Sequence, residues 1–462
     1  MPEGAGEPVL PTTDRLPESQ KLAYSGLLVP VAILHAPALS VLPALYAKHS
    51  GIAIATIGLA LMAVRVLDAV TDPLIGYFSD RTTTSYGRRK PWILAGALVC
   101  SLAVYFQFRP GPTTGAFYFF TWSLVLYVGW TLVEIPHSAW LSDLTRDYDE
   151  KTRLAGFRVA AGFVGDIIFR MSPLLPLFAT TEMTPEVTAF VSWFVIAMLI
   201  PLTLLALWKV RQGQPFTGER PRVGETLQAL TGNKPFQIYF AMTLATNLSS
   251  GMVGGLYFFF LDAHLGILER FAHVGLTVAV IGLISTFVWP RIIERMEKHY
   301  ALVLTNSAVV ATLVAMGFIQ PGPYAFPLLL AVFGISSFFA AGAIIVLTSM
   351  LADIVDYDTK STGKNRAGNY YALLAFAQKF GVALGGGLGL FVAGMFGFDA
   401  QGDNDARAMT GFYLMFLGVP IMLNATAATL AWRFPLGRAE HARILRELAG
   451  EANAGRLPGQ AG

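Results

Sequence analysis

The sequence has one cysteine, Cys100, and few charged residues. A single cysteine in an apolar run cannot form an intrachain disulfide or a cysteine-based zinc cluster, so both kinds of scaffold are excluded. Charged residues make up 14% of the 462 residues, and the net charge of +3 is spread along the chain. Because the chain has no basic tract, we expect no nucleic-acid partner.

Motifs of membrane-embedded enzymes are missing as well. The apolar segments contain no His-Glu-x-x-His, no Gly-x-Ser-x-Gly and no paired Ser/Lys arrangement, which are patterns that carry hydrolytic chemistry. We therefore expect a protein that is not an enzyme. The first twenty residues contain Pro, Glu and Asp in place of the apolar stretch of a signal peptide, which predicts no cleaved signal and a cytoplasmic N-terminus.

Apolar sequence, in contrast, is abundant: hydrophobic residues make up 54% of the chain, and the mean hydropathy is +0.54. These values indicate an integral membrane protein. Twelve windows of about 20 apolar residues, the length that spans a bilayer, predict an all-α membrane protein with twelve transmembrane helices. They lie at 24–47, 54–79, 92–109, 116–142, 156–180, 188–209, 235–262, 271–293, 301–319, 325–352, 368–397 and 409–434.

A long polar stretch divides these windows into two groups of six. The predicted organisation is a cytoplasmic tail at 1–23, a six-helix bundle at 24–209, a cytoplasmic middle loop at 210–234, a second six-helix bundle at 235–434 and a cytoplasmic tail at 435–462.

Lys and Arg are distributed unevenly between the loops. With a cytoplasmic N-terminus, eighteen lie in the inner loops and four, Lys48, Arg109, Arg270 and Arg407, in the outer ones. Since cytoplasmic loops carry the excess of Lys and Arg, this bias predicts a multi-pass protein of the cell (inner) membrane with both termini in the cytoplasm.

The two halves resemble each other. LSDLTRDYDEKTR, at 141–153, follows the fourth window, and LADIVDYDTKSTGKNR, at 351–366, follows the tenth. Matching acidic, aromatic and basic loops in a chain of six plus six spans are typical of transporters whose halves are related by an axis along the membrane normal. The repeat therefore predicts two pseudo-symmetric bundles that rock about a central site.

Three charged side chains lie within the 54–79 window. Arg65, Asp68 and Asp72 are three and four residues apart, which places them on one helical stripe. Buried charges in a membrane are expensive and by default indicate function. Two carboxylates about 6 Å apart repel by roughly 3 kcal/mol at an effective dielectric constant of about 20. Such a site favours a cation, a proton or a basic neighbour such as Arg65 or Lys379; the alternative is an ion-pair network that only joins the halves.

The loop after this window resembles the Gly-x-x-x-Asp-Arg-x-Gly-Arg-Arg loop of the major facilitator superfamily. SDRTTTSYGRRKPW begins at Ser79, and the resemblance implies the fold of that superfamily and a loop that acts in conformational change. The matching positions are Gly76, Asp80, Arg81, Gly87, Arg88 and Arg89.

A closer resemblance comes from several stretches together: RVLDAVTDP, WTLVEIP, DYDEKTRLAGFR, ADIVDYD and Lys379. The chain resembles the glycoside-pentoside-hexuronide:cation symporter family, of which melibiose permease is a member. The resemblance implies coupled transport of a sugar or glycoside with Na⁺, H⁺ or Li⁺. It also implies a cation site made by Asp68, Asp72 and Thr131, whose hydroxyl is a suitable hard ligand for Na⁺.

The resemblance implies a solute site too. Glu134 stands where the family has an aspartate that accepts sugar hydroxyls, and Arg158 matches a family arginine. A carboxylate and a guanidinium can divide a polyol between acceptor and donor roles; the alternative is a mutual salt bridge. The full set of expected solute-binding residues is Glu134, Arg158, Lys379, Trp130, Ser138 and Asn247.

The chain also departs from the family. Between Lys21 and Lys48 it has no acidic residue, where sugar transporters of the family have an aspartate, and Ser138 replaces a tryptophan that stacks on the sugar. These departures predict either a solute that is held more weakly than in the sugar transporters of the family or a solute with a group such as a carboxylate or an apolar aglycone. We expect a glycoside or a uronide-like solute, and the alternative is an amphiphile such as a lysolipid.

Other polar groups in the spans allow two interpretations each. Asp166 and Arg170, four residues apart, either join a coupling network with Arg65 and Lys379 or simply neutralise each other. His35 and His137 are proton sites or packing residues.

Two glycine-containing runs are equally open. TNLSSGMVGG, at 246–255, either breaks its helix to line a cavity, which we favour, or lets neighbours pack closely. GVALGGGLG, at 381–389, favours close packing over phosphate binding, since no strand precedes it. We expect a monomer in the lipid bilayer, with a small-molecule solute and a coupling cation as its partners.

Overall fold

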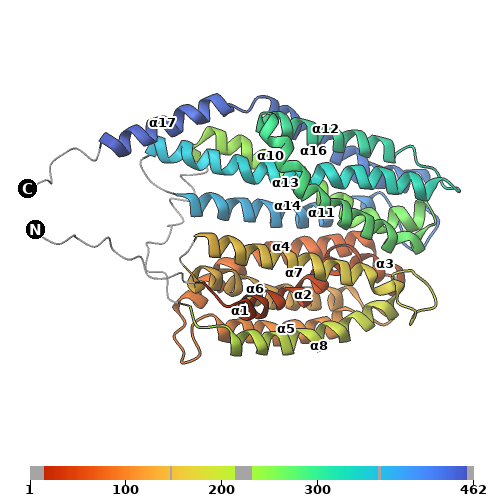
Figure 1. Cartoon of the computed structure of the whole chain (residues 1–462). Helices are drawn as coiled ribbons and strands as arrows, with labels where there is room; N and C mark the ends of the chain where they lie inside the picture. The colour runs from red at the N-terminus through yellow and green to blue at the C-terminus, as the bar shows by residue number, and fades with distance from the viewer. Residues whose placement is uncertain (1–14, 146–147, 214–230, 363–365, 455–462) are drawn as a thin grey trace, which may run out of the picture.

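The computed structural model describes residues 15–145, 148–213, 231–362 and 366–454, and the elements in these ranges are all helices. Two bundles of roughly parallel helices lie side by side (Figure 1). We call them the N-terminal bundle, α1 to α8, and the C-terminal bundle, α10 to α17. The predicted all-α membrane fold is confirmed.

The N-terminal bundle begins with three short helices, the first two of which together form one segment of membrane-spanning length, Glu18–Ser40. The predicted 24–47 window is divided near Leu27 and Val41, and Pro43, at the start of α3, lacks an N–H to continue the helix before it. The helices are α1 (Glu18–Gly26), α2 (Leu28–Ser40), α3 (Leu42–Ser50), α4 (Ile54–Arg81), α5 (Lys90–Gln107), α6 (Ala116–Leu144), α7 (Tyr148–Met171) and α8 (Pro185–Lys209).

The C-terminal bundle contains two π-helical turns, η2 and η4, that continue α10 and α15. Its elements are α10 (Lys234–Phe259), η2 (Phe260–His264), η3 (Leu268–Arg270), α11 (Phe271–Arg295), α12 (Lys298–Met316), α13 (Ala325–Thr362), α14 (Ala367–Met395), α15 (Ala406–Tyr413), η4 (Leu414–Gly418), α16 (Val419–Trp432) and α17 (Arg438–Ala454).

Eleven helical segments in the described parts of the chain are long and apolar enough to cross a membrane. The predicted 156–180 span corresponds to α7, whose seven charged side chains keep it outside this group. The predicted limits of this span are wrong, because α7 begins at Tyr148 and ends at Met171. It stops where Pro173 follows, in a 3₁₀ turn at Ser172–Leu174, since proline restricts the residue before it and lacks an N–H.

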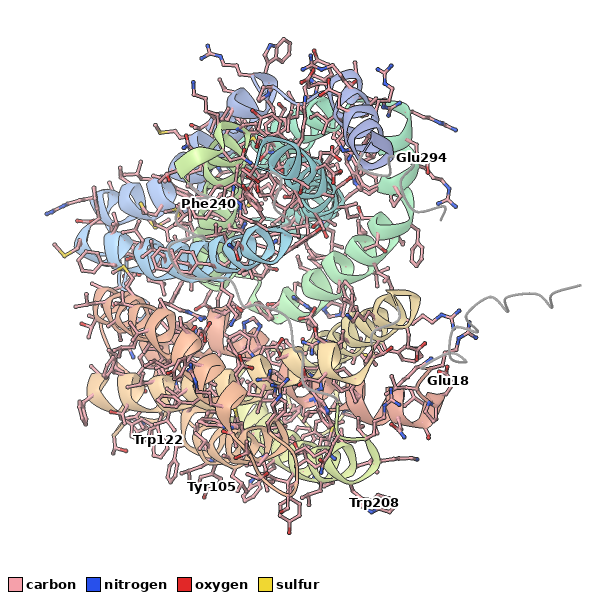
Figure 2. The ribbon with its side chains drawn as sticks, turned by 90° about the vertical axis from the view of Figure 1, so that its left-hand side faces the viewer. Glu18, Tyr105, Trp122, Trp208, Phe240 and Glu294 are labelled. Carbon is pink, nitrogen blue, oxygen red and sulfur yellow. The ribbon has the colours of Figure 1, made fainter. Side chains whose placement is uncertain are left out.

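Large apolar side chains cover the outside of the bundles. Trp208 is 83% exposed and Phe117 is 81% exposed, and Figure 2 shows Trp208, Tyr105 and Trp122 at the periphery of the N-terminal bundle. Exposed apolar surface on this scale is expected where a protein faces lipid.

Glycines bring the helices of both bundles close together. A Cβ atom added to Gly251 on α10 would lie 1.9 Å from the carbonyl oxygen of Val382 on α14. One added to Gly58 on α4 would lie 2.5 Å from the carbonyl oxygen of Gly387. Because α14 thus packs on α10 and on α4, it joins the two bundles. The preferred interpretation of 246–255 as a helix break is wrong, since α10 is continuous there, and the close-packing interpretation of 381–389 is confirmed.

Helix α17 follows the last predicted span and packs against the end of α13. His441 Nε2 lies 2.9 Å from Asp356 Oδ2, and Lys360 forms an ion pair with Glu447. The hydrogen bond from Lys360 lowers the pKa of the Glu447 carboxyl.

Several expectations fall outside the described residues. They concern residues 1–14, 214–230 and 455–462 of the predicted tails and middle loop, and the inner-loop residues Arg146, Arg220, Arg222 and Lys364.

Candidate cation and solute sites

The buried stripe of α4 lies against α6. Asp68 Oδ1 accepts a hydrogen bond of 3.0 Å from Thr131 Oγ1, and Asp68 Oδ2 lies 3.2 Å from an Arg65 nitrogen. Arg65 and Asp68 are 6% and 7% exposed, and the Arg65 guanidinium lies 3.8 Å from the centre of the Tyr127 ring. Asp68 is thus held by one hydroxyl and one cation from its own bundle.

Asp72, one turn further along α4, has a partner from the other bundle. Lys379 Nζ on α14 donates to Asp72 Oδ2 over 3.1 Å. The other oxygen, Asp72 Oδ1, is buried and has no hydrogen-bond partner in the described parts of the chain. We call Arg65, Asp68, Asp72, Thr131 and Lys379 the aspartate cluster.

The aspartate cluster offers oxygen ligands to a hard cation. Thr131 donates its proton to Asp68, so the lone pairs of its hydroxyl remain available. Among the residues that the structure describes, no group of three or more His, Cys, Asp or Glu side chains could hold a metal ion. A cation here would therefore use two carboxylates with hydroxyl or carbonyl oxygens, a ligand set that suits Na⁺ better than a transition metal.

The predicted solute pair is in direct contact. Arg158 donates from one terminal nitrogen to Glu134 Oε1 at 2.8 Å and to Ser138 Oγ at 2.9 Å. Ser138 in turn donates to Glu134 over 3.1 Å. We call Glu134 and Arg158 the glutamate–arginine pair. Its side chains are 25% and 15% exposed, so the pair is a salt bridge between α6 and α7 that a polar ligand can still reach.

Sequence reasoning gave no role to Tyr24, which completes this site. The other terminal nitrogen of Arg158 lies 3.0 Å from the Tyr24 hydroxyl and 2.7 Å from His137 Nδ1. His137 Nε2 lies 2.9 Å from the Tyr24 carbonyl oxygen, and the two rings stack with centroids 4.1 Å apart. His137 is fully buried with both ring nitrogens partnered, as expected of a packing residue. Tyr24 is a polar residue within a predicted apolar span, and this was the sequence feature from which its role could have been predicted.

The remaining predicted solute residues lie elsewhere. The Trp130 ring is 5.3 Å from Lys379 Nζ and 4.1 Å from the ring centre of His35, so Trp130 and Lys379 belong with the aspartate cluster. Asn247, on α10 of the other bundle, donates to the Thr243 carbonyl over 2.7 Å and lines a separate cavity. The structure therefore brings together Glu134, Ser138 and Arg158 but not the whole predicted set.

Asp166 and Arg170 form the expected pair on α7, with Arg170 Nε 2.7 Å from Asp166 Oδ2. The Arg170 side chain also extends to α11. A Cβ atom added to Gly275 would lie 2.6 Å from an Arg170 terminal nitrogen. The pair is thus neutral as a unit but reaches the other bundle.

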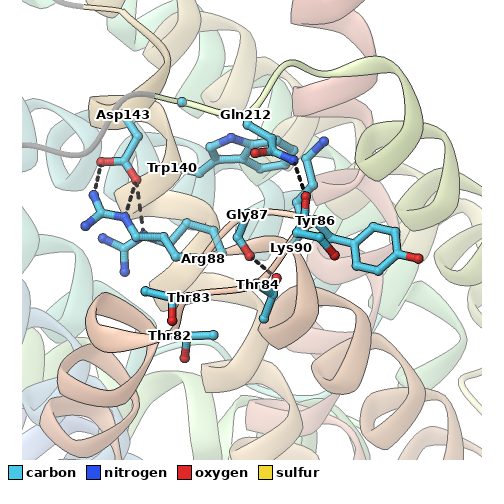
Figure 3. Close-up of a pocket in the computed structure, with 13 residues that line it drawn as sticks. Thr82, Thr83, Thr84, Tyr86, Gly87, Arg88, Lys90, Trp140, Asp143 and Gln212 are labelled. Atoms are coloured by element: carbon cyan, nitrogen blue, oxygen red, sulfur yellow. Dashed lines mark hydrogen bonds and ion pairs between the residues drawn. The ribbon is translucent and has the colours of Figure 1, made fainter.

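The loop between α4 and α5 ties three helices together. Arg88 lies 2.7 Å from Asp143 at the end of α6 (Figure 3). Arg89 donates to Ser79 Oγ at 2.8 Å, lies 3.3 Å from Asp143 and pairs with Asp80. Arg88 and Arg89 therefore fix the ends of α4, α5 and α6 relative to one another.

The other loop-motif residues have separate places. Gly87 has φ of +97°, which favours glycine, and its carbonyl accepts from Thr84 Oγ1 at 2.6 Å (Figure 3). The Arg81 guanidinium lies 3.5 Å from the Tyr77 ring centre, and Gly76 faces Ile135. The loop borders a cavity of about 490 Å³.

The repeat in the C-terminal bundle places an aspartate in the same way. Asp353, in LADIVDYD, lies 2.7 Å from Lys298 at the start of α12, as Asp143, in LSDLTRDYD, lies near Arg88 and Arg89. In each half, an aspartate of the repeat therefore forms an ion pair with a Lys or Arg at a junction between two helices.

At the end of α4 opposite its loop with α5, polar contacts join the bundles. Lys48 Nζ, in the last turn of α3, lies 2.8 and 2.7 Å from the two carboxylate oxygens of Asp262 in η2. Thr181 donates to the Glu269 carbonyl over 3.0 Å, and Gln401 donates to the Lys48 carbonyl. This face is therefore closed between the bundles.

Comparisons with known proteins agree with this arrangement. The profile of a family described as "MFS/sugar transport protein" matches residues 24–438. The chain is 25% identical to an uncharacterized symporter of Synechocystis, over 83% of this chain and 84% of that protein. It is 22% identical to the glucuronide carrier protein homolog of Escherichia coli, over 87% and 89% of the two chains. A mutant of the nucleoside transporter NupG has a similar fold, with a TM-score of 0.65, 14% identity and coverage of 90% and 98%.

Proposed function

The chain belongs to the MFS/sugar transport protein family, and on that premise we propose that it is a secondary active transporter that moves a sugar, glycoside or uronide-like solute together with Na⁺ or H⁺. Family membership and the symporter and glucuronide carrier names of its relatives support this solute and the coupling. The protein carries its solute unchanged and acts as a monomer in the cell membrane. The excess of Lys and Arg in the inner loops, counted from the sequence, supports cytoplasmic termini.

One observation carries the coupling step: Lys379 of the C-terminal bundle lies 3.1 Å from Asp72 of the N-terminal bundle, whose second oxygen has no partner in the described residues. A cation that binds Asp72 and Asp68 with the Thr131 hydroxyl neutralises the charge that Lys379 now neutralises. Lys379 and the cation therefore compete for Asp72. Binding of the cation frees Lys379 from α4 and removes a contact between the bundles, so it biases their relative movement.

The glutamate–arginine pair is the proposed solute site. Solute hydroxyls can accept from Arg158 and donate to Glu134, which requires the 2.8 Å contact between them to open. Thr131 and Glu134 are three residues apart on α6, so the aspartate cluster and this pair share one helix face. This shared face supports direct coupling between cation and solute.

The closed face supports an assignment of the conformation. With cytoplasmic termini, the Lys48–Asp262 pair closes the bundles toward the outside. The state is then one in which exchange takes place with the cytoplasm, as expected for release of an imported solute.

The comparisons do not favour the amphiphile alternative. The relatives described above carry the names of a symporter and a glucuronide carrier, and no contact within the glutamate–arginine pair favours a lipid chain.

A ligand screen tests the proposal. Purified protein is heated with a panel of monosaccharides, disaccharides, glycosides, uronic acids and lysolipids, with and without Na⁺ and at two pH values. A ligand that binds the native state raises the apparent Tm by mass action. We expect a sugar or glycoside to raise it, and the cation to increase the effect. A response to lysolipids alone would contradict the proposal.

A further inference from the structure

The last helix, α17, lies along the end of α13 and contacts the C-terminal bundle through one stripe of residues (Figure 1). Arg438, His441, Ile444 and Glu447 follow at intervals of three, which places them on one face of the helix. Ile444 is 1% exposed and belongs to the same buried apolar cluster as Ile354 of α13. This stripe is therefore the surface through which α17 docks on the bundle.

Two polar contacts of the stripe are made by groups that keep their charge near neutral pH. Arg438 donates to the Glu294 carbonyl, near the end of α11, over 3.0 Å, and Lys360 of α13 forms an ion pair with Glu447. Arg and Lys side chains are protonated in this range, and Glu is ionised. A change of pH near neutrality therefore leaves these two contacts unaltered.

His441, between them on the stripe, lies against two carboxylates of α13. Its Nε2 is 2.9 Å from Asp356 Oδ2 and 3.6 Å from Asp353 Oδ1. Asp353 is also 2.7 Å from Lys298 of α12, whereas Asp356 contacts no other cation in the part of the chain that the structure describes. The His441 side chain is 22% exposed, so its proton can exchange with water. We call Lys298, Asp353, Asp356 and His441 the histidine cluster.

The charge of the histidine cluster depends on His441. When His441 is protonated, two cations face two carboxylates. When it is neutral, Lys298 alone balances them, and the imidazole keeps a single N–H donor. The other charged or titratable groups on the elements packed here have contacts of their own: Arg438, Glu440, Arg443 and Glu447 on α17, Lys360 on α13, and Glu297 and His299 at the start of α12.

The matching corner of the N-terminal bundle is built without a histidine among the described contacts. Asp143, the counterpart of Asp353 in the repeat, pairs with Arg88 and Arg89, and arginine stays charged in proteins. Histidine ordinarily changes its charge between about pH 5 and 8. The contact of α17 with its bundle therefore contains a cation that can be lost near neutral pH.

We propose that the histidine cluster is a proton-binding site that controls the docking of α17: the protonated His441 holds the helix on α13, and loss of the proton loosens it. Docking brings the imidazole to two carboxylates, whereas an undocked α17 leaves it in water, so protonation favours the docked state by linkage. Docking is then tightest at low pH and weakens as the pH rises through the range in which histidine titrates.

The histidine cluster shares no residue with the aspartate cluster or the glutamate–arginine pair, so this proton is distinct from the coupling cation. With the cytoplasmic termini proposed above, α17 would respond to the pH of the cytoplasm. Only this last point rests on the proposed function.

Hydrogen–deuterium exchange of the full-length protein in detergent tests the proposal. A helix of 17 residues without tertiary contacts is marginal in water, so undocking exposes the amides of residues 441–447 to exchange. At each pH the measured rate is compared with that of an unstructured peptide of the same sequence, which removes the pH dependence of the exchange chemistry. We expect the protection of 441–447 to fall about three- to fivefold between about pH 5.5 and about pH 8, as the charge of a partly exposed ion pair is lost.

Two variants separate the charge of His441 from its hydrogen bond. His441→Gln keeps a donor without a charge, so its protection should be low and equal at both pH values. His441→Arg keeps a permanent charge, so its protection should stay high at both. His299→Gln, which changes a histidine 3.9 Å from Glu297 at the start of α12, is the matched control and should show the same fall as the unmodified protein.

Protection that does not change with pH in the unmodified protein, or a fall in His441→Gln equal to that of the unmodified protein, would overturn the proposal. Loss of the fall in His299→Gln would also overturn it, because the proton would then act elsewhere in this corner. The measurement uses neither solute nor transport, so each of these outcomes leaves the proposed function unaffected.

Discussion

Lys379 and Asp72 form an ion pair across the two bundles, with Nζ 3.1 Å from Oδ2. The pair is half-buried, and it is made by α14, the helix whose glycines pack directly against α4. Because the proposed cation binds the same carboxylate, the ammonium and the cation exclude each other. The pair therefore links the occupancy of the cation site to the contact between the bundles.

The first prediction concerns this competition. Lys379→Gln removes the competing charge, so we expect the apparent cation affinity to rise by about tenfold, which corresponds to about 1.4 kcal/mol. Solute affinity should change much less. Both are measured by titrating the purified protein with Na⁺ and with solute at fixed pH. A larger change in solute affinity than in cation affinity would count against the assignment.

The second prediction concerns the glutamate–arginine pair. Glu134→Gln and Arg158→Ala each leave a buried charge without its partner, a change that costs about 3–5 kcal/mol in buried pairs and less here, because the pair is partly exposed. Both variants should lose solute binding. Arg158→Lys keeps the charge but lacks the two-nitrogen fork, so it should recover binding only in part. Wild-type solute affinity in both Glu134→Gln and Arg158→Ala would make this site assignment wrong.

The third prediction concerns the closed face. Lys48→Glu replaces the contact with Asp262 by a repulsion, and a partly exposed pair of this kind contributes about 1 kcal/mol or less. We therefore expect a shift of a few-fold toward a state open on this face. Ser250 of α10 lines a cavity of about 250 Å³ between the bundles, together with Leu39 and Arg65. The shift is measured as the alkylation rate of Ser250→Cys by an impermeant maleimide added outside intact cells.

The chain suits this measurement, since its only cysteine, Cys100, is 1% exposed. The charge reversal Lys48→Asp with Asp262→Lys is the control and should return the rate toward that of the parent. Equal alkylation rates in Lys48→Glu and its parent would show that the pair does not hold this face closed.

The fourth prediction concerns the inner loop. Asp143→Asn weakens the contacts with Arg88 and Arg89 that fix α4, α5 and α6. The ion pairs of these residues do not include Glu134 or Arg158. We therefore expect the transport rate to fall several-fold while the solute Kd changes by less than about twofold, where a tenfold change would correspond to about 1.4 kcal/mol. Initial rates of uptake and equilibrium binding separate the two effects. A changed Kd with an unchanged rate is the contrary result.

Much of the fold follows from local sequence. Windows of apolar residues predict most helices because a bilayer-spanning helix must be apolar over its length. Spacing alone places Arg65, Asp68 and Asp72 on one stripe of α4, where the structure has them. Helix α7 ends at Met171 because Pro173 follows. The predicted window ran on to residue 180, since apolar residues continue after this proline.

The contacts between helices could not be predicted from local sequence. Nothing in the sequence selects Asp72 over Asp68 as the partner of Lys379, because that choice depends on the close packing of α4 and α14. The contact of Arg158 with Tyr24 joins residues 134 positions apart. Asn247 was expected among the solute-binding residues, but it lines a separate cavity of the C-terminal bundle. Helix α10 is continuous there, because its glycines serve packing and not a break.

The most direct test of the coupling is cation-driven solute uptake into proteoliposomes by the unmodified protein, Asp68→Asn and Asp72→Asn, with imposed Na⁺ or pH gradients. Asp356→Asn, an aspartate of α13 that contacts His441 outside the aspartate cluster, is the matched control. We predict that the gradient stimulates uptake by the unmodified protein and the control, and that both cluster variants lose this stimulation while they remain folded and keep some solute binding. Unchanged Na⁺ and pH dependence in both cluster variants would contradict a cation site at Asp68 and Asp72.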